Sequence, residues 1–559
     1  MAATFRRVAL LACAFGASAG ASAPAAQQSW FHDATPGTGW DTAPSGATPY
    51  PRMNVPDVMA GGVALFDFDS DGDLDVYFSN VDCLYPNAGR IQNPTNRLYR
   101  QDANGRFTDV TRSSRVEHWE YGIGVAIGDF DNDGHPDLFA SNFGQDLLFR
   151  NAGDGTFEDV TARAGLTSDG WSSSALFFDY DRDGLLDLFV AQYVFYDFAK
   201  ECTDPAGRPD FCGPRMFPPT PDRLFHNEGN GRFRDVSDAS GVARESAAGL
   251  GVVSADFNED GWPDLYVAND AYPNHLWINQ GNGTFLDDAL LLGAALNEHG
   301  KPEAGMGVVA ADFDNDADLD LFMTHLKKET NTYYRNLGPG GFEDATNAVG
   351  LGQASVPFTG FGTVSLDVEL DGDLDLLVAN GAVNRGRPID GVSMGEPWNW
   401  FAEPNLAFLN TNGVFALTTT GFEVFTAPVE MSRGLAAGDL DGDGDLDVVV
   451  ANAHSASRLY RNDAPRAGRY LVVRAIDANR DALGATVTVE AGERRFLRLV
   501  AGAQSYLSSG DMRAHFGLGD VSSVDAITVR WADGTFERFP GGAVDRAIDL
   551  RRGEGEIGS

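Results

Sequence analysis

The chain has 559 residues, and its 41 Lys and Arg against 81 Asp and Glu give a formal net charge of −40. A surface this negative repels phosphate backbones and anionic lipids, which excludes nucleic-acid binding through bulk charge. The 43% hydrophobic and 11% aromatic residues can fill large cores, and 65 glycines with abundant Asp are typical of many short strands joined by turns. This composition excludes a disordered acidic tail and a mostly helical protein.

The N-terminal segment has the features of an export signal. Arg6 and Arg7 precede an apolar run too short to span a bilayer, and Ala-x-Ala cleavage choices lie between Ala17 and Ala25. We predict a signal peptide over residues 1–23, cleaved somewhere between 19 and 26. Residues 10–13 only loosely resemble a lipoprotein box, so an outer-membrane lipoprotein is the less favoured outcome. We expect a secreted, periplasmic or cell-surface protein without a transmembrane segment, because no later run reaches ~20 apolar residues.

A nine-residue acidic pattern, called here an acidic window, recurs seven times along the chain. The windows are DFDSDGDLD from Asp67, DFDNDGHPD from Asp129, DYDRDGLLD from Asp179, DFNEDGWPD from Asp256, DFDNDADLD from Asp312, DVELDGDLD from Asp367 and DLDGDGDLD from Asp439. Each window follows an apolar run such as GIGVAIG and precedes a short β-type run such as LFASN. Most then continue with an aromatic strand, an Asn/Gly turn and a further strand. The repeated unit is therefore predicted to be four short antiparallel strands.

Seven such units predict an all-β fold, a seven-bladed β-propeller over residues 29–465, because radial repetition leaves few unprotected strand edges. The seventh unit ends at residues 458–463 without its last strand. The missing strand has a counterpart near the N-terminus, where FHDAT at residues 31–35 matches FEDVT at residues 157–161. We therefore expect the N-terminal strand to complete the seventh blade and close the ring; a chance five-residue match is the alternative.

Within each acidic window the positions differ in what they tolerate. Positions 1, 5 and 9 are always Asp, and position 3 is Asp except at Asn258 and Glu369. Position 6 is Gly except at Ala317, as a sharp backbone bend requires, and position 7 varies as if only its carbonyl were used. The predicted metal ligands, at positions 1, 3, 5, 7 and 9, are Asp67, Asp69, Asp71, Asp73 and Asp75; Asp129, Asp131, Asp133, His135 and Asp137; Asp179, Asp181, Asp183, Leu185 and Asp187; Asp256, Asn258, Asp260, Trp262 and Asp264; Asp312, Asp314, Asp316, Asp318 and Asp320; Asp367, Glu369, Asp371, Asp373 and Asp375; Asp439, Asp441, Asp443, Asp445 and Asp447.

This donor set is typical of a calcium site. Ca²⁺ takes six to eight oxygens at about 2.3–2.6 Å, whereas Mg²⁺ keeps a rigid octahedron with several waters and Zn²⁺ prefers His and Cys. An EF-hand is rejected because position 12 is never Glu; it is Phe78, Ala140, Val190, Val267, Met323, Val378 or Val450. The alternative, that the Asp residues only form turns, leaves their mutual repulsion uncompensated. We predict up to seven structural Ca²⁺ sites, with the Ala317 loop the weakest. Catalytic metals are not expected in seven copies without an open position.

Two long insertions interrupt the repeats. Residues 191–221 contain Tyr193, Tyr196, Phe211 and Phe217, and residues 381–404 contain Arg385, Arg387, Trp398, Trp400 and Phe401. Aromatic residues beside Arg predict a contact surface for a glycan or protein partner, and loop packing is the equally weighted alternative. In an oxidising compartment, Cys202 and Cys212 are expected to form a disulfide, which leaves Cys83 without an assigned partner.

These residues resemble the FG-GAP/VCBS repeats of integrin α-chain propellers, through GxGV followed by DxDxDGxxDL. The tail, about residues 469–541, resembles an ASPIC/UnbV domain through GATVTVEAGE, SYLSSGDMRAHFGLG and AITVRWADGTFERF. The combination is similar to the cartilage acidic protein family and its bacterial relatives. The resemblance implies secretion, calcium-binding propeller loops and a matrix, adhesion or cell-surface role. From it we predict a small C-terminal β-sandwich-like domain at residues 466–545, followed by a tail at residues 546–559.

Two functions are compatible with this sequence. The favoured one is a calcium-binding adhesion or recognition scaffold for a glycan or protein partner. The alternative is an extracellular polysaccharide-acting enzyme with catalytic carboxylates in the insertions, for which Glu201, Glu396 and Glu403 are the candidates. We assign no catalytic and no cofactor-binding residue, and the oligomeric state is left open.

Overall fold

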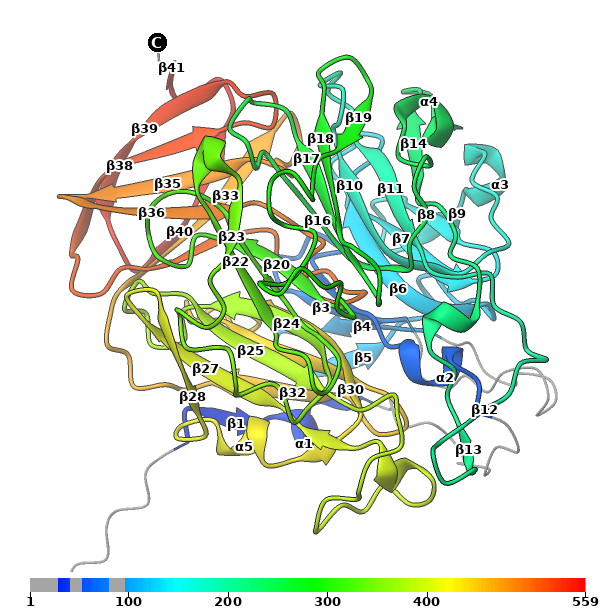
Figure 1. The fold of residues 1–559 in the computed structure, drawn as a ribbon. Coiled ribbons are helices and arrows are strands. Elements are labelled where there is room, and N and C mark those ends of the chain that lie inside the picture. The colour runs from blue at the N-terminus through cyan, green and yellow to red at the C-terminus, as the bar shows by residue number, and fades with distance from the viewer. Residues whose placement is uncertain (1–28, 41–52, 80–95, 558–559) are drawn as a thin grey trace, which may run out of the picture.

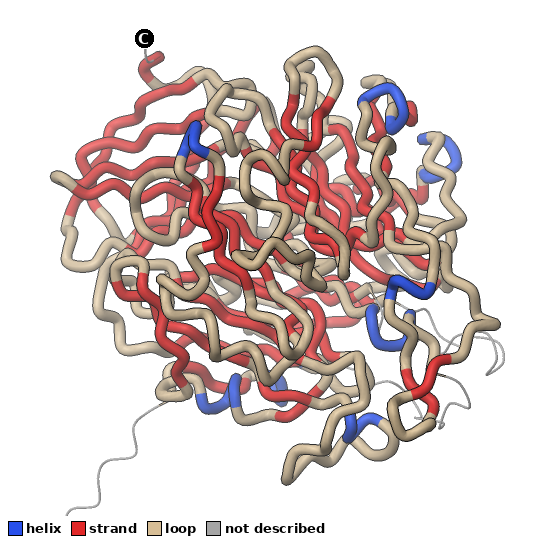
Figure 2. The backbone as a smooth tube through the Cα atoms, in the orientation of Figure 1, coloured by secondary structure: helices blue, strands red, loops and turns tan. Residues whose placement is uncertain are grey.

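The computed structural model describes residues 29–40, 53–79 and 96–557. The predicted signal peptide and Cys83 lie outside these residues. Strands dominate the fold, and short helices lie mainly at its edges (Figure 2). Within the described ranges, no helix is both long enough and apolar enough to cross a membrane.

The repeats form seven four-stranded antiparallel sheets, and each acidic window joins the first strand of a sheet to the second. The sheets are β2 (Val63–Phe66), β3 (Asp75–Phe78), β4 (Arg97–Gln101) and β5 (Phe107–Asp109); β6 (Tyr121–Gly128), β7 (Asp137–Phe143), β8 (Leu147–Asn151) and β9 (Phe157–Asp159); β10 (Ser172–Phe178), β11 (Asp187–Gln192), β14 (Arg223–Asn227) and β15 (Phe233–Asp235); β16 (Gly249–Ala255), β17 (Asp264–Asn269), β18 (His275–Asn279) and β19 (Phe285–Asp287); β20 (Val308–Ala311), β21 (Asp320–Met323), β22 (Thr332–Asn336) and β23 (Phe342–Asp344); β24 (Gly360–Leu366), β25 (Asp375–Asn380), β27 (Leu406–Thr411) and β28 (Val414–Thr418); β30 (Ser432–Gly438), β31 (Asp447–Asn452), β32 (Arg458–Asn462) and β1 (Phe31–Asp33).

The arrangement of these sheets is propeller-like (Figure 1). Their first strands contact one another in the cyclic order β2, β6, β10, β16, β20, β24, β30 and back to β2. The small residues of these strands permit the close approach. A Cβ added to Gly362 of β24 would lie 2.5 Å from the carbonyl oxygen of Arg433 of β30, a distance that no side chain tolerates. Apolar clusters such as the one that joins Val63 and Leu65 to Ala436 and Val449 fill the space between neighbouring sheets.

The fourth strand of the last sheet comes from the N-terminal end of the described chain. Strand β1 pairs antiparallel with β32, and Phe31 lies opposite Asn462. The ring of Phe31 is 1% exposed and packs in the cluster between the last two sheets. This is the place that the match between FHDAT and FEDVT predicts for the strand.

A chain of side-chain amides links each sheet to the one before it. In six sheets, the Asn at the end of the third strand donates from Nδ2 to the carbonyl at position 2 of the preceding acidic window, and Gln101 does so in the first sheet. The donor–acceptor pairs are Asn151–Phe68 (2.8 Å), Asn227–Phe130 (2.8 Å), Asn279–Tyr180 (2.8 Å), Asn336–Phe257 (3.2 Å), Asn410–Phe313 (2.9 Å), Asn462–Val368 (3.1 Å) and Gln101–Leu440 (2.8 Å).

Short elements decorate this frame. They are α1 (Thr35–Thr38), α2 (Pro56–Met59), α3 (Thr161–Ala164), α4 (Ser237–Ser240), α5 (Glu423–Thr426), the 3₁₀ turns η2 (Pro214–Met216), η3 (Gly338–Gly340) and η4 (Trp398–Trp400), and the strand pairs β12 (Cys202–Thr203) with β13 (Pro209–Asp210) and β26 (Glu403–Pro404) with β29 (Val429–Glu430).

Two further sheets form a C-terminal β domain, coloured orange to red in Figure 1. One contains β33 (Tyr470–Asp477), β34 (Arg480–Asp481), β37 (Ala514–Gly517) and β40 (Arg546–Arg551); the other contains β36 (Arg494–Leu499), β35 (Thr486–Ala491), β38 (Ser523–Arg530), β39 (Phe536–Ala543) and β41 (Glu556–Ile557). They share one core that includes Val487, Phe516 and Trp531. The predicted tail from residue 546 is wrong, because β40 pairs in parallel with β33 and β41 pairs with β39.

The C-terminal domain sends one segment among the first strands of the seven sheets. This inner segment, residues 502–513, shares hydrogen bonds with six of those strands: Leu65 N with Ser509 O (3.0 Å), Val125 N with Leu507 O (3.1 Å), Leu507 N with Ser174 Oγ (3.0 Å), Val308 N with Ser505 O (3.1 Å), Thr363 N with Ser505 Oγ (2.9 Å) and Asp511 N with Ala437 O (3.1 Å). Tyr506 and Leu507 are at most 1% exposed. The inner segment therefore fastens the C-terminal domain to the repeats.

Replacing Tyr506 with Phe tests this attachment. The Tyr506 hydroxyl donates to the carbonyl oxygen of Met59 at 2.7 Å in a fully buried setting. Tyr506→Phe leaves that acceptor unpaired, so we expect the free energy of unfolding to fall by about 1–2 kcal/mol. Tyr470→Phe, on the partly exposed start of β33, is the matched control and is expected to change it by less than about 0.5 kcal/mol. Equal effects of the two variants in denaturant titrations would contradict the assigned role.

Candidate metal centre

Each acidic window is folded by the carboxylate at its first position. In the windows that begin at Asp67, Asp129, Asp179, Asp312 and Asp367, one oxygen of that carboxylate accepts from the N–H of position 5 and the other from the N–H of position 6. Both backbone bonds require left-handed residues at positions 4 and 6, as Asn132 (φ 58°) and Gly134 (φ 91°) show. Ala317 holds φ 77° at position 6, which costs roughly 1–2 kcal/mol for a residue with a Cβ. That strain is a further reason to expect the weakest ion binding in this loop.

The carboxylate at position 9 has a structural task in all seven windows. It is almost fully buried, and its two oxygens accept from the backbone N–H of position 2 and from that of the residue at the end of the third strand. In the fourth sheet, Asp264 Oδ2 accepts from Phe257 N at 3.1 Å and Oδ1 from Asn279 N at 2.8 Å. Position 9 therefore ties the acidic window to two other segments of its own sheet.

The side chain at position 3 leaves one oxygen free. In five windows this oxygen is buried and has no hydrogen-bond donor: Asp69 Oδ1, Asp131 Oδ1, Asp181 Oδ1, Asp314 Oδ1 and Glu369 Oε2. A buried carboxylate oxygen without a donor is costly, and a cation removes that cost. Ligand oxygens of Asp67, Asp69 and Asp71 lie within 4.8 Å of one another, and the same holds for groups in the windows that begin at Asp129, Asp179 and Asp312. This donor set fits a hard cation such as Ca²⁺.

Burial and repulsion by neighbouring acids raise the pKa of the carboxylates at position 9. Burial, and then the charges of Asp69 and Asp67, raise the pKa of Asp75 to about 8 despite two backbone hydrogen bonds. The same causes, with Asp181 and Asp179 as the neighbours, raise the pKa of Asp187 to about 9. The charged forms are therefore disfavoured until positive charge is supplied.

Two windows depart from the common pattern. The Asn258 side chain bonds within its own loop, because Oδ1 accepts from Asp260 N at 3.0 Å and Nδ2 donates to Asp260 Oδ2 at 3.0 Å. In that window the buried oxygen without a donor belongs to position 1, Asp256 Oδ1. In the window from Asp439 it belongs to position 7, Asp445 Oδ1. The coordination of these two windows is therefore expected to differ from that of the other five.

The predicted carbonyl ligand at position 7 stays a prediction. The backbone N–H of position 7 donates to the carboxylate of position 5, as His135 N does to Asp133 Oδ1 at 3.1 Å. The side chains of this position serve other contacts; the Arg182 guanidinium lies 3.8 Å from the centroid of the Trp262 ring. Leu185, at the same position, is only partly exposed.

Basic residues that were not predicted also support the windows. They occupy the third strand, directly before its last residue, and approach the acids of their own window: Arg150 contacts Asp131 and Asp133, His226 Nδ1 lies 3.2 Å from Asp187 Oδ1, Arg335 Nε lies 3.1 Å from Asp314 Oδ2, and Arg461 contacts Asp447. The signal was the repeated dipeptide Arg-Asn or His-Asn. Where position 3 is Asn or Glu, the third strand has Ile278 or Leu409 instead.

The C-terminal domain covers the side of the repeats that carries the windows. Arg530 Nη2 pairs with Asp256 Oδ2 at 2.7 Å, and Arg494 Nη2 donates to the carbonyl oxygen of Asp371 at 3.1 Å. Arg480 Nη1 donates to Asn132 Oδ1 at 2.8 Å. Positive residues from three different strands thus meet the acidic windows, and the sequence pattern of the C-terminal domain gave no sign of them.

Most of the aromatic side chains in the two insertions are buried, whereas a contact surface needs them exposed. Tyr193, Phe211, Phe217, Trp398 and Phe401 are at most 6% exposed and share one buried cluster with Tyr506. For these five residues the loop-packing alternative is confirmed, and they do not form the exposed contact surface. Tyr196 and Trp400 are partly buried against it. Phe195, at 70% exposed, is the large aromatic residue that this insertion presents to solvent.

The other expectations for the insertions have mixed outcomes. The disulfide between Cys202 and Cys212 is confirmed, with an S–S distance of 2.09 Å. Glu403 is buried, accepts from Thr359 N at 2.7 Å and pairs with Lys327 at 3.3 Å, which is the setting of a structural acid. Glu396 accepts from Trp400 Nε1 at 2.7 Å. Glu403 and Glu396 thus both have hydrogen-bond partners within the protein.

Comparison with known families agrees with this architecture. The FG-GAP-like repeat model matches residues 67–140, 129–190, 207–267 and 256–323, and the FG-GAP repeat model matches residues 432–466. The model described as ASPIC and UnbV matches residues 476–557. The chain therefore contains FG-GAP repeats in an all-β, propeller-like fold. Its C-terminal domain is an ASPIC and UnbV domain, and it shares this combination with cartilage acidic protein 1.

Two cartilage acidic proteins show the extent of the similarity. Cartilage acidic protein 1 of Mus musculus is 28% identical over 323 residues, which cover 56% of this chain and 38% of that protein. The Homo sapiens protein is 26% identical over 321 residues, which cover 56% and 37%. The matched region thus spans less than half the length of these relatives.

Solved structures share the fold only weakly. A lectin of Agrocybe aegerita, described as recognising non-reducing terminal N-acetylglucosamine, has a TM-score of 0.38 at 16% identity and covers 72% of this chain and 94% of its own. The lectin BP39L of Burkholderia pseudomallei has a TM-score of 0.40 at 10% identity and covers 73% and 97%. At these TM-scores neither likeness identifies a ligand.

Proposed function

We propose that the chain is an exported, calcium-stabilised, closed seven-bladed propeller that acts as an adhesion or recognition scaffold for a glycan or protein partner. The observation that carries the calcium part is the repeated buried oxygen without a donor at position 3, five times in the same place of the repeat. Seven copies of one site favour ions that hold the fold together over ions that act on a substrate. The predicted signal peptide and the disulfide between Cys202 and Cys212 favour export.

Closure of the ring is supported by the bonds between its first and last sheets. Gln101 of the first sheet donates from Nε2 to the carbonyl oxygen of Leu440, in the last sheet, at 2.8 Å. This bond repeats the side-chain amide link found between the other sheets. Strand β1 adds the fourth strand of the last sheet. A ring held by both chain ends leaves few strand edges open.

The insertion at residues 191–221 is the surface we assign to the partner. Phe195 is 70% and Met216 50% exposed, and both lie on a segment fastened by the disulfide and by the bond from Phe195 N to Pro218 O at 2.8 Å. A rigid exposed aromatic binds with little loss of conformational entropy. Phe195 is therefore the expected anchor.

An array of glycans and matrix proteins, probed with the full chain in calcium, tests this assignment. We expect at least one ligand class to bind, and Phe195→Ser to weaken that binding about tenfold, as the loss of an interface anchor does. Leu291→Ser removes an apolar side chain that is 84% exposed elsewhere and is expected to bind as the unmodified chain does. No bound class, or equal loss in both variants, would contradict the proposed surface.

A further inference from the structure

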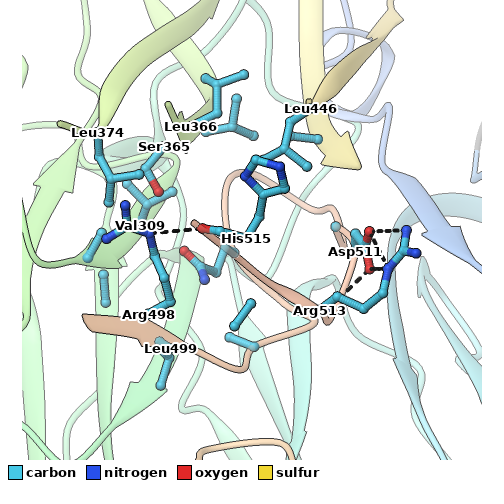
Figure 3. Close-up of a pocket in the computed structure, with 18 of the residues that line it drawn as sticks. Val309, Ser365, Leu366, Leu374, Leu446, Arg498, Leu499, Asp511, Arg513 and His515 are labelled. Carbon is cyan, nitrogen blue, oxygen red and sulfur yellow. Dashed lines mark hydrogen bonds and ion pairs between the residues drawn. The ribbon is translucent and has the colours of Figure 1, made fainter. Parts of the chain in front are cut away.

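The seam between the C-terminal domain and the repeats contains a cavity of about 110 Å³ (Figure 3). Its walls on the repeat side come from β20, β24 and β30, including Val309, Ser365 and Leu366. The facing wall comes from β36, β37 and the inner segment. One buried water needs roughly 10–15 Å³ in this measure, so the seam cavity has room for several water-sized groups. It exists only where the two parts of the chain meet.

Arg498 brings an unpaired charged donor to this cavity. The side chain is 7% exposed, Nε donates to His515 O at 3.1 Å and Nη1 donates to Leu497 O at 2.8 Å. Nη2 is buried and has no hydrogen-bond partner. Among the described residues, no carboxylate oxygen forms an ion pair with the Arg498 guanidinium within 4 Å, although the charges of Asp367 and Asp312 act on it from farther away. A buried guanidinium with a free donor is costly unless an acceptor reaches it.

The acids that line the cavity already have partners. Asp511 Oδ2 pairs with Arg513 Nη2 at 2.5 Å. Asp367 accepts from Asp371 N at 2.9 Å and from Gly372 N at 2.7 Å. Arg498 Nη2 is thus free to donate a hydrogen bond to a ligand in the cavity.

His515 offers an acceptor at the same cavity. Its Nε2 lies 2.6 Å from the carbonyl oxygen of Gly444, which can only accept, so Nε2 carries the proton. Burial lowers the pKa of His515 to about 4, so the ring is neutral near neutral pH and Nδ1 has a free lone pair. Nδ1 is buried and has no partner. A hydroxyl that donates to Nδ1 would satisfy it.

We propose that the seam cavity binds a small hydroxy acid, whose carboxylate accepts from Arg498 Nη2 and whose hydroxyl donates to His515 Nδ1. The carboxylate meets the charged donor, the hydroxyl meets the neutral acceptor, and the cavity volume limits the ligand to a few heavy atoms. The ligand touches both the repeats and the C-terminal domain, so it stabilises their attachment. Parts of the windows from Asp367 and Asp439 line the seam cavity, through Asp367, Leu374 and Leu446, whereas the Phe195 surface lies outside it.

Glycolate and acetate form a matched pair of probes, because they share the carboxylate and differ by one hydroxyl. At constant ionic strength and calcium, we expect calorimetry to show glycolate binding to the full chain at one site, with acetate weaker. Arg498→Met should weaken glycolate about tenfold or more, since it removes a charge-assisted hydrogen bond in a buried site. His515→Phe should abolish the preference for glycolate over acetate. Arg495→Met, which changes an exposed arginine of β36 outside the cavity, should bind glycolate as the unmodified chain does.

A crystal of the unmodified chain soaked in glycolate keeps the test independent of how the variants fold. Density for glycolate between Arg498 and His515 is the expected result. Water alone in the seam cavity, no heat with glycolate, or the same affinity after Arg498→Met in a folded variant would each overturn the proposal.

Discussion

Chelation of calcium is expected to lower the melting temperature of the full chain by about 10 °C or more. Without an ion, each acidic window holds several carboxylates close together in a partly buried loop, and unit charges 4 Å apart repel by roughly 4 kcal/mol at an effective dielectric of 20. A single ion at a hundred times its Kd stabilises the folded state by about 2.7 kcal/mol. Several occupied windows therefore give a large combined effect.

Scanning calorimetry before and after dialysis against EGTA measures this effect. Added Ca²⁺ should restore the transition, and Mg²⁺ at the same concentration should restore little of it, because Mg²⁺ demands a rigid octahedron and keeps several of its waters. Atomic absorption should count up to seven bound ions, and the Ala317 loop should be the first to empty. An unchanged transition after chelation, or equal recovery with Mg²⁺, would contradict calcium as the stabilising ion.

The parts of the fold that the sequence predicted are those that the chain repeats. Because seven copies of the acidic window align, positions with a fixed task stand out against positions that vary, and the backbone bend at Gly134 was predictable from spacing alone. Asp264 was predicted only as a metal ligand, and its bonds to two strand amides were not foreseen. The pairing of Phe31 with the last sheet was predictable for the same reason, since its segment copies a strand found in other repeats.

Features that occur once were predicted poorly. Tyr506 bonds to Met59, more than 400 residues away, and no local period marks such a contact. Trp398 is buried and stacks on His454, with ring centroids 3.6 Å apart. Composition alone could not distinguish this buried tryptophan from an exposed one. The end of the C-terminal domain was missed although its signal was present, since RAIDLR at residues 546–551 alternates as a strand does.

The basic residues around the windows show where a residue-by-residue analysis falls short. Arg150 and Arg335 sit in a repeated place and were visible in the alignment of the repeats, but their task appears only once the third strand is folded against its window. The arginines of the C-terminal domain, such as Arg530, had no repeat to mark them. The positive charges that balance the acidic windows therefore come from segments that only the folded chain brings together.

Replacing Asp264 with Ala is expected to lower the free energy of unfolding by about 4 kcal/mol, because two buried backbone donors lose their acceptor at once and each costs roughly 1–3 kcal/mol. Those donors are Phe257 N, at 3.1 Å, and Asn279 N, at 2.8 Å. Burial raises the pKa of Asp264 well above its usual range, so the carboxylate is itself costly there. It is retained because no smaller side chain offers two acceptors in opposite directions.

A graded series separates this structural task from loss of an ion ligand. Asp264→Asn keeps one acceptor and should cost about half as much as Asp264→Ala, whereas Asp260→Ala, at the exposed position 5 of the same window, removes a proposed ligand without orphaning strand amides. Unfolding is followed in calcium and after EGTA. The cost of Asp264→Ala should persist without calcium, because the two amides are orphaned in either condition, while that of Asp260→Ala should shrink. If the cost of Asp264→Ala vanished with the ion, position 9 would act only as a ligand and its role in fastening the strands would be wrong.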